Sequence, residues 1–139
     1  MIKLVDVYTE IAEMRPATKF LYELLKEREP HQNISHREMP SFEEHTRFVD
    51  SRPYREWYVI FNGNIVVGAI YLSKQNEIGI FISEIRQGEG YGKQAVRLLM
   101  NRHPGERFLA NINPLNARSI NVFLDLGFEL IQFTYAKET

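Results

Sequence analysis

The chain has 139 residues and a formal net charge of −1, with 44% hydrophobic and 25% charged residues. This composition is typical of one soluble globular domain, here spanning residues 1–139, and the near-zero charge argues against nucleic acid or an acidic membrane surface as a partner. The absence of cysteine excludes disulfides, thiolate metal ligands and a cysteine nucleophile. We expect a cytoplasmic protein, because MIKLVDVYTE is unlike a targeting signal and no apolar run approaches the roughly 18 residues of a membrane helix.

The first half of the chain alternates between strand and helix patterns. Period-two alternation predicts a strand over 2–8, and helical spacing predicts a helix over 10–28, which Pro16 can kink or restart. Ser41 followed by Glu44 has the pattern of a capping box at the start of the helix SFEEHTRFV. The pair Asn62-Gly63 lies between two β-rich runs and predicts a hairpin with a type I′ turn, followed by a third strand over 77–83.

The second half predicts two more helix–strand units. A helix over 90–102 is followed by the strand RFLANI. Asn113 and Pro114 have the pattern of an N-cap and a first helical residue, and that helix ends at Gly127. The stretch FELIQFTYA predicts a closing strand. The order β-α-α-β-β-β-α-β-α-β indicates an α/β protein with a mixed sheet covered by helices.

Three glycines alternate in RQGEGYGKQAV, just where a helix begins: Gly88, Gly90 and Gly92. The first N–H groups of a helix have no intrahelical partner, and glycine lets an anion approach them closely. The stretch therefore predicts a phosphate site, with a purely structural turn as the alternative. No GK[ST] follows it, and it comes late in the chain after an antiparallel hairpin, so a Walker loop and a dinucleotide fingerprint are disfavoured.

Two motifs resemble those of the GNAT superfamily of N-acetyltransferases. QGEGYG matches the motif Q/R-x-x-G-x-G/A, and NPLNARSINVFLDLGFEL is similar to the second signature, an Asn followed by a helix ending in GF. The resemblance implies the GNAT fold, with a splay between the fourth and fifth strands. It also implies acetyl-CoA as cofactor and direct attack by a primary amine in a ternary complex. The branch it resembles contains ribosomal-protein and amino-sugar acetyltransferases.

The same resemblance implies a set of cofactor-binding residues. Strand residues 80–82 would pair with the pantetheine arm, the loop amides would hold the pyrophosphate, and the motif Asn would hydrogen-bond the arm. The set is Ile80, Phe81, Ile82, Gln87, Gly88, Glu89, Gly90, Tyr91, Gly92, Lys93, Asn116 and Ser119.

Glu77 is the candidate general base for the proton of the attacking amine, whose pKa is about 10.4 for a free alkyl amine. It opens the third strand and shares a strand face with Gly79, Phe81 and Ser83. An exposed glutamate without a catalytic role, or a water chain to a backbone carbonyl, is the alternative. A backbone amide near Ile82 is the candidate donor for the developing oxyanion.

The group that protonates the leaving thiolate is less clearly marked. Many GNAT enzymes carry a tyrosine seven positions after the motif Asn, where this chain has Phe123, a position that helical spacing predicts for the core. Ser119 is the substitute candidate, with a hydroxyl that only bonds the preceding helical turn as its alternative. Tyr91 and Tyr135 are further candidates.

The acceptor-binding candidates are His36 and Arg37, in the polar loop where GNAT proteins place such residues, and Asn111 at a strand end. The histidine spacings match no zinc motif, so we expect no metal. We expect a small-molecule amine as substrate, an amino sugar or a nucleotide-linked amino sugar, with a protein N-terminus or lysine as the enzymatic alternative. A degenerate CoA-binding or interaction module is the rival of another class, and pairing of the closing strand makes a homodimer a further expectation.

Overall fold

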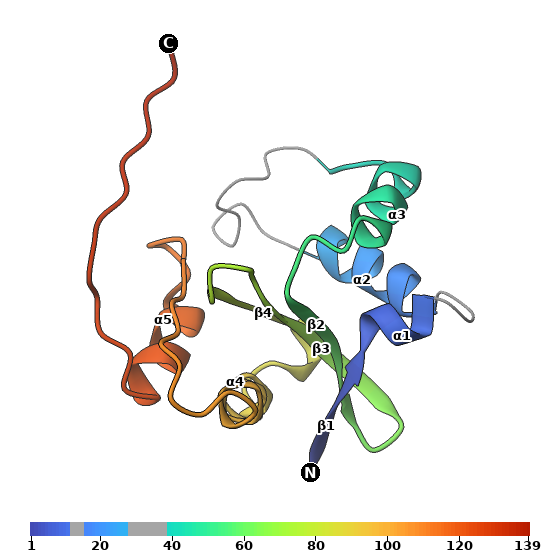
Figure 1. Cartoon of the computed structure of the whole chain (residues 1–139), viewed down its shortest axis with the longest axis horizontal. Coiled ribbons are helices and arrows are strands. Elements are labelled where there is room, and N and C mark those ends of the chain that lie inside the picture. The colour runs from blue at the N-terminus through green and yellow to red at the C-terminus, as the bar shows by residue number, and fades with distance from the viewer. Residues whose placement is uncertain (12–15, 28–38) are drawn as a thin grey trace.

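A computed structural model describes residues 1–11, 16–27 and 39–139 of the chain (Figure 1). At its centre is a four-stranded antiparallel sheet in the order β1-β2-β3-β4. The strands are β1 (Ile2–Asp6), β2 (Glu56–Asn62), β3 (Ile65–Leu72) and β4 (Ile78–Ile82).

Helices cover both faces of this sheet (Figure 1). On one face lie α1 (Val7–Ile11), α2 (Pro16–Lys26) and α3 (Phe42–Asp50), whose buried side chains form one core cluster with Trp57, Val59 and Ala69. On the other face, α4 (Tyr91–Asn101) and α5 (Ala117–Asp125) pack with the alternate strand residues Tyr58, Ile60 and Ile70. Because β2 and β3 are central, they bury side chains on both faces. No helix of the described residues is long and apolar enough to cross a membrane.

The N-terminal elements are shorter than the alternation predicted. β1 ends at Asp6, whose side chain accepts a hydrogen bond from the Tyr8 N–H at 2.8 Å and so caps the first turn of α1. Within the range predicted as helical, 10–28, α1 reaches Ile11 and α2 begins at Pro16, so the restart that Pro16 was expected to allow is confirmed. Proline lacks an N–H and has a helical φ, which suits a first helical position.

Two local predictions in the middle of the chain are confirmed and one detail is wrong. Ser41 and Glu44 form the capping box reciprocally at the start of α3. The hairpin between β2 and β3 is present, but its turn is shifted by one residue. Asn62 pairs with Ile65, so the central residues are Gly63 and Asn64, and only Gly63 has a positive φ, of 62°. A positive φ at the first central residue alone is the pattern of a type II′ turn, not of type I′.

The strand predicted at RFLANI is reduced to a single parallel bridge between Leu109 and Glu77. Leu109 uses both of its backbone groups there: its N–H donates to the Asn76 carbonyl at 2.9 Å, and its carbonyl accepts from Ile78 at 2.7 Å. Beyond this bridge the two segments separate, so β4 is the edge strand of the described sheet.

The prediction for the start of the last helix is wrong by three residues. The N-cap of α5 is Asn116, whose side chain accepts from the Ser119 N–H at 3.2 Å. Asn113 instead accepts from the Leu115 N–H at 2.9 Å and from Asn116 through its carbonyl, so Pro114 occupies a turn rather than the helix.

The predicted helix end at Gly127 is confirmed. Gly127 has φ +91° and its N–H donates to Leu124, while the Phe128 N–H donates to Phe123 at 3.0 Å, a Schellman motif. The Phe123 and Phe128 rings meet edge-on, with centroids 5.0 Å apart. After this cap the predicted closing strand is absent: within the described chain, residues 129–136 belong to no sheet (Figure 1).

Candidate functional site

The glycine-rich loop lies between β4 and α4 and passes through the short 3₁₀ turn η2 (Glu84–Arg86). Gly88 and Gly90 have φ of +85° and +82°, a left-handed conformation that favours glycine. Gly90 is the N-cap of α4, and the first hydrogen bond of the helix runs from the Gln94 N–H to the Gly90 carbonyl. The N–H groups of residues 91–93 therefore have no helical acceptor and carry the positive end of the helix dipole.

The outer edge of β4 adjoins this loop. Between residues 77 and 83, the odd-numbered residues make the backbone hydrogen bonds to the β3 side. The backbone N–H and carbonyl groups of Ile78, Ile80 and Ile82 therefore point away from β3. Ile78 meets Leu109 at the bridge, and the Ile82 carbonyl accepts from the Gln87 side chain at 3.0 Å. The backbone groups of Ile80 lie between these two contacts, on an edge to which an extended chain with amide groups can add.

Gly92 brings the loop and the strand edge together. A Cβ at Gly92 would lie 3.6–3.8 Å from the side chains of Ile80, Ile82 and Val122, so the first turn of α4 packs closely against β4 and α5. An anion at the loop and an extended chain along β4 would therefore be continuous. The arrangement suits a phosphate joined to an amide-containing arm.

Glu77 stands at the start of β4 and is held by two side chains. Its Oε1 accepts from the Ser73 hydroxyl at 3.1 Å, and its Oε2 accepts from the Asn111 amide. The Glu77 N–H also donates to the Ser73 hydroxyl oxygen at 2.9 Å. Two residues singled out from the sequence, Glu77 and Asn111, thus meet across the bridge. The sequence analysis did not single out Ser73. Its position at the start of the turn SKQN, four residues before Glu77, is the sequence feature that could have indicated this contact.

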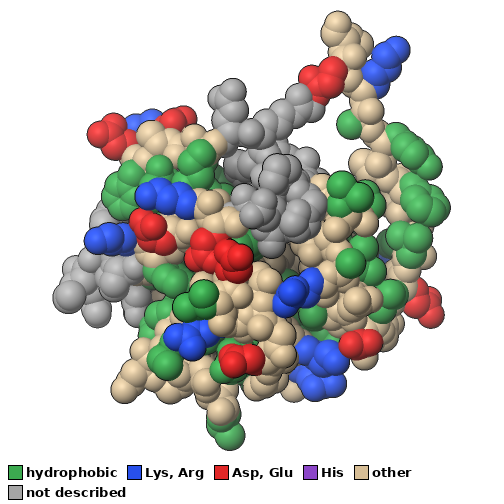
Figure 2. All heavy atoms as spheres, turned by 180° about the vertical axis from the view of Figure 1, so that it is seen from behind, with side chains coloured by type: hydrophobic (Ala, Val, Ile, Leu, Met, Phe, Trp, Pro, Cys, Tyr) green, Lys and Arg blue, Asp and Glu red, His purple; other side chains and the backbone are tan. Residues whose placement is uncertain are grey.

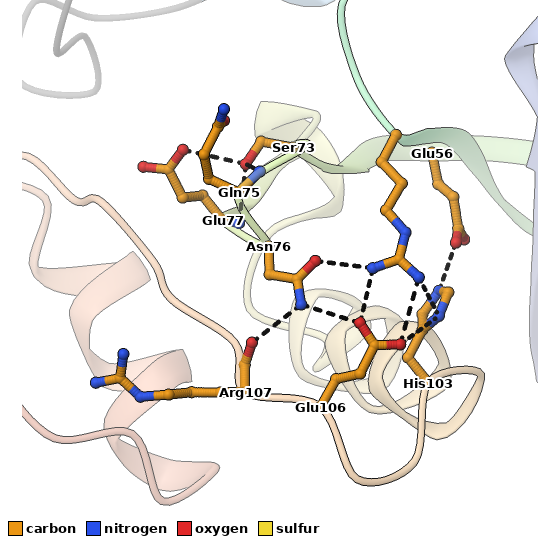
Figure 3. A network of polar contacts seen from close by, with 9 residues as sticks. Glu56, Ser73, Gln75, Asn76, Glu77, His103, Glu106 and Arg107 are labelled. Atoms are coloured by element: carbon orange, nitrogen blue, oxygen red, sulfur yellow. Dashed lines mark hydrogen bonds and ion pairs between the residues drawn. The ribbon is translucent and has the colours of Figure 1, made fainter.

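A network of polar contacts fixes the segment that carries Asn111 (Figure 3). Arg55 donates to both oxygens of Glu106, at 2.7 and 3.3 Å, and to Asn76 at 2.8 Å. The Asn76 side-chain amide in turn donates to Glu106 at 3.0 Å and to the Arg107 carbonyl oxygen at 3.2 Å. The network joins β2, the turn before β4 and the chain after α4, so it holds the bridge in register. Its other members are Glu56, His103 and Arg107.

This network predicts an acid-sensitive stability. Hydrogen bonds from Arg55 and Asn76 lower the pKa of Glu106 from 4.5 to about 2. Because the folded pKa is depressed, the stabilisation is present above pH 4.5 and is lost as the pH falls towards 2. We expect the difference in melting temperature between the wild type and Glu106→Gln to be constant from pH 7 to 5 and to shrink between pH 4.5 and 2. A constant difference throughout that acidic range would contradict the role given to the carboxylate.

An apolar cavity of about 230 Å³ lies between the sheet and helices α2 and α3, on the face that Glu77 shares with Gly79 and Phe81. Its wall contains the stacked rings of Tyr54 and Tyr71, with centroids 3.8 Å apart and planes 6° apart. The other lining residues are Leu21, Leu24, Leu25, Pro40, Glu44, His45, Phe48, Trp57, Ala69 and Ile80. Such a cavity suits the apolar face of a ring.

The other residues singled out from the sequence lie on α4, on α5 and in the segment after α5. Ser119 lies in the first turn of α5 near Asn116, and Lys93 forms an ion pair with Asp125 at 3.0 Å. Tyr91 accepts a hydrogen bond from Asn62 at 2.9 Å, and a hydrogen bond with Glu89 raises its pKa. Phe123 is buried in the core as helical spacing predicted, and Tyr135 is exposed.

The predicted acceptor-binding residues His36 and Arg37 lie outside the described residues, as does His31. His45 is buried, its Nε2 lies 3.2 Å from the Thr18 carbonyl oxygen, and burial lowers its pKa. In the part of the chain that the structure describes, no group of three or more His, Asp or Glu is placed to hold a metal ion.

Comparison with known proteins places this architecture in a family. The model of the acetyltransferase (GNAT) family matches residues 18–128. No curated protein matches the chain in sequence. Among solved structures, a domain from Methanocaldococcus jannaschii is similar, with 25% identity, a TM-score of 0.75, and coverage of 93% of this chain and 88% of that one.

Two further structures show the same fold. An acetyltransferase from Thermus thermophilus has 20% identity and a TM-score of 0.72, with 95% of this chain and 89% of that one covered. The ribosomal L7/L12 α-N-protein acetyltransferase RimL, solved with coenzyme A, has 22% identity and a TM-score of 0.69, with 89% and 77% covered. The chain belongs to the GNAT family of acetyltransferases, enzymes that use acetyl-CoA as their cofactor.

Proposed function

We propose that this acetyltransferase acetylates the primary amine of a small molecule carried on a ring, such as an amino sugar or a nucleotide-linked amino sugar, by direct attack in a ternary complex. The observation that carries the proposal is the position of Glu77. Its carboxylate lies at the start of β4, on the face that lines the aromatic cavity and beside the outward edge that suits the cofactor. Glu77 itself does not line the cavity, but Gly79, two residues further along the same strand face, does, and so does Ile80, whose backbone faces the outward edge.

The loop and the β4 edge fit acetyl-CoA by the chemistry of their donors. We assign the pyrophosphate to the amides of residues 88–93, which the left-handed Gly88 and Gly90 leave open to approach. The outward N–H and carbonyl of Ile80 would hold the pantetheine amides as an added strand does, and Gln87 would fix the neighbouring Ile82 carbonyl. Asn116 uses its side-chain oxygen as the N-cap of α5, so its amide N–H would be the group that reaches the arm.

Acetyl-CoA supplies an activated carbonyl when it is bound; this chain's residues orient the amine and handle its proton. Glu77 would accept that proton, because Ser73 and Asn111 orient the two oxygens of its carboxyl group. The outward N–H of Ile82 would donate to the developing oxyanion. The Ser119 hydroxyl would donate a hydrogen bond to the leaving sulfur. Phe123 has no hydroxyl that could do so, and its side chain is buried in the core.

The apolar cavity supports a ring-bearing acceptor over a flexible polycation. Aromatic rings of Tyr54, Tyr71 and Trp57 form one wall, and Glu44 is the one acidic residue among the described lining residues. Stacking against aromatic rings is a general way to bind the apolar face of a sugar or base. A polycation would need several carboxylates along the cavity to offset its charge.

Gly79→Ala tests the cavity. A Cβ there would lie 2.1 Å from two ring atoms of Tyr71, so the ring must leave its stack on Tyr54. We expect a loss of about 1–3 kcal/mol in stability from overpacking and a raised KM for the amine, on the order of tenfold, with acetyl-CoA affinity retained. In Gly79→Ala/Tyr71→Ala the stability loss should be smaller than the sum of the single losses, while KM stays raised. An unchanged KM in Gly79→Ala would remove the cavity from acceptor binding.

The proposed function is tested by measuring release of free coenzyme A thiol with panels of amines at saturating acetyl-CoA. We expect turnover with amino sugars or nucleotide-linked amino sugars to exceed that with peptides bearing a free N-terminus, with peptidyl lysine and with polyamines. Preference for a peptide panel would replace the amino sugar by a protein acceptor. Firm acetyl-CoA binding without turnover of any amine would favour a cofactor-binding module instead.

A further inference from the structure

The apolar cavity has walls from two elements that differ in their connection to the cofactor loop. From α2 the lining residues are Leu21, Leu24 and Leu25, and from β4 they are residues 79–81. β4 continues through η2 into the glycine-rich loop, which leads to α4 on the opposite face of the sheet (Figure 1). The position of α2 against the end of β4 therefore affects both the width of the cavity and the start of the proposed pyrophosphate site.

Glu27, the first residue after α2, joins these two elements. Its Oε1 accepts a hydrogen bond from the Glu84 N–H at 2.8 Å, and each of its two carboxyl oxygens lies 3.3 Å from the Ser83 hydroxyl, which donates to them. The Glu27 N–H donates to the Leu24 carbonyl at 3.1 Å, so this residue is fixed to the last turn of α2. Because Glu27 is half-buried, water competes less for these hydrogen bonds than it would at an exposed position.

The two groups that Glu27 holds stand where the chain turns from β4 towards the glycine loop. Just beyond β4, the Ser83 N–H donates to the Val67 carbonyl at 2.9 Å. Glu84 is the first residue of η2, so its N–H has no acceptor within the turn, and Ser83, in the N-cap position, makes no side-chain cap hydrogen bond. Glu27 supplies this cap from α2, 57 positions away in the sequence. Gln87, directly after η2, opens the glycine motif.

The neighbouring charges of α2 do not form a similar link. The Lys26 Nζ pairs with Glu23 at 3.4 Å within the helix, and both side chains are about half exposed, at 52% and 53%. On the face seen in Figure 2, described side chains of both charge signs are interspersed rather than gathered into a patch of one sign. Such mixing leaves only a weak field at a distance. Direct contacts such as those of Glu27 are therefore what can transmit a change from the loop to α2.

We propose that Glu27 is a positioning residue that couples the cofactor loop to α2, so that acetyl-CoA bound at the loop also fixes the helical wall of the cavity. A ligand at the loop restricts the chain from Glu84 onwards, and Glu27 passes this restriction to the end of α2. Because such coupling is reciprocal, an acceptor that packs on α2 would strengthen acetyl-CoA binding by the factor by which acetyl-CoA strengthens its own. The acceptor half of this inference rests on the proposed function, whereas the link between loop and helix does not.

Amide hydrogen exchange with coenzyme A as the probe tests the link without any amine. In the wild type, saturating coenzyme A should slow exchange over residues 84–93 and also, by about fivefold or more, over α2. In Glu27→Ala the loop should remain protected by coenzyme A, while the added protection of α2 should be lost. Glu27→Gln should restore it, because a glutamine can accept from the Glu84 N–H and donate to the Ser83 hydroxyl oxygen.

Two further variants control this result. Glu23→Ala removes an exposed carboxylate from the same helix and should behave as the wild type. Ser83→Ala weakens the contact from the other side and should reduce the protection of α2. Combined with Glu27→Ala, it should add no further loss, because both substitutions act on one contact. Equal protection of α2 in the wild type and in Glu27→Ala, or no protection of α2 in the wild type, would overturn the coupling.

Steady-state kinetics then test the acceptor half. With the panel amine of highest turnover and saturating acetyl-CoA, Glu27→Ala should raise the KM for the amine about fivefold, with a smaller change in kcat. A purely structural role would lower the melting temperature without this split between KM and kcat. An unchanged KM beside lost protection of α2 would contradict the cavity as the acceptor site, and with it the acceptor half of the inference, while the link between loop and helix would stand.

Discussion

Replacing Gly90 by alanine is expected to weaken acetyl-CoA binding by on the order of tenfold or more, equivalent to about 1.4 kcal/mol or more. Gly90 is the N-cap of α4 with φ +82°, and its nearest atom to an added Cβ is the Gln94 amide, 3.9 Å away. The methyl group would therefore meet little of the protein itself. It would stand instead at the proposed pyrophosphate site, in front of the amides of residues 91–93.

Gly105→Ala is the matched control for backbone strain. Gly105 has the same φ of +82°, and an added Cβ meets nothing within 4 Å. Both variants should lose about 1–2 kcal/mol of stability through the left-handed conformation. Only Gly90→Ala should lose cofactor affinity, which isothermal titration calorimetry with acetyl-CoA measures directly. Equal affinities in the two variants would mean that the loop does not receive the pyrophosphate.

Glu77→Gln is expected to lower kcat by about 10²–10⁴-fold, with acetyl-CoA affinity unchanged. Glutamine keeps the shape of the side chain and an oxygen that can accept from Ser73, but it does not take up a proton. The measurement is steady-state turnover at saturating acetyl-CoA, with kcat and the KM for the amine determined separately. Glu84→Gln, an exposed position on η2 beyond the same strand, should leave both constants unchanged.

Asn111→Ala removes the hydrogen bond that Asn111 donates to the Glu77 carboxylate and leaves the carboxylate itself in place. Asn111 donates to Glu77 and does not itself carry the proton, so kcat should fall less than in Glu77→Gln. Combining the two substitutions should add little to the loss from Glu77→Gln alone, because both act through one carboxylate. Unchanged turnover in Glu77→Gln would remove this residue from the mechanism and leave a water chain to a backbone carbonyl as the proton acceptor.

Local features of the fold were predictable because they depend on residues a few positions apart. Ser41 and Glu44 form their capping box, and Gly127 ends α5 in the left-handed conformation. The N-cap of α5 was misplaced because Asn113-Pro114 and Asn116 carry equally good capping chemistry. The side chain of Asn113 bonds Leu115 two residues on, which makes a turn where a helix start was expected.

The family was determined by the sequence alone, through the motif QGEGYG and the Asn-initiated helix that ends in GF. The structure adds that Gly88 and Gly90 have φ of +85° and +82°, a left-handed conformation that favours glycine. Only the tertiary structure decided that Glu77 and Asn111, 34 positions apart, share a hydrogen bond, and that Tyr71 covers Gly79. It also decided the state of FELIQFTYA: alternation specifies a strand's two faces, but a strand forms only where a free edge supplies its hydrogen bonds.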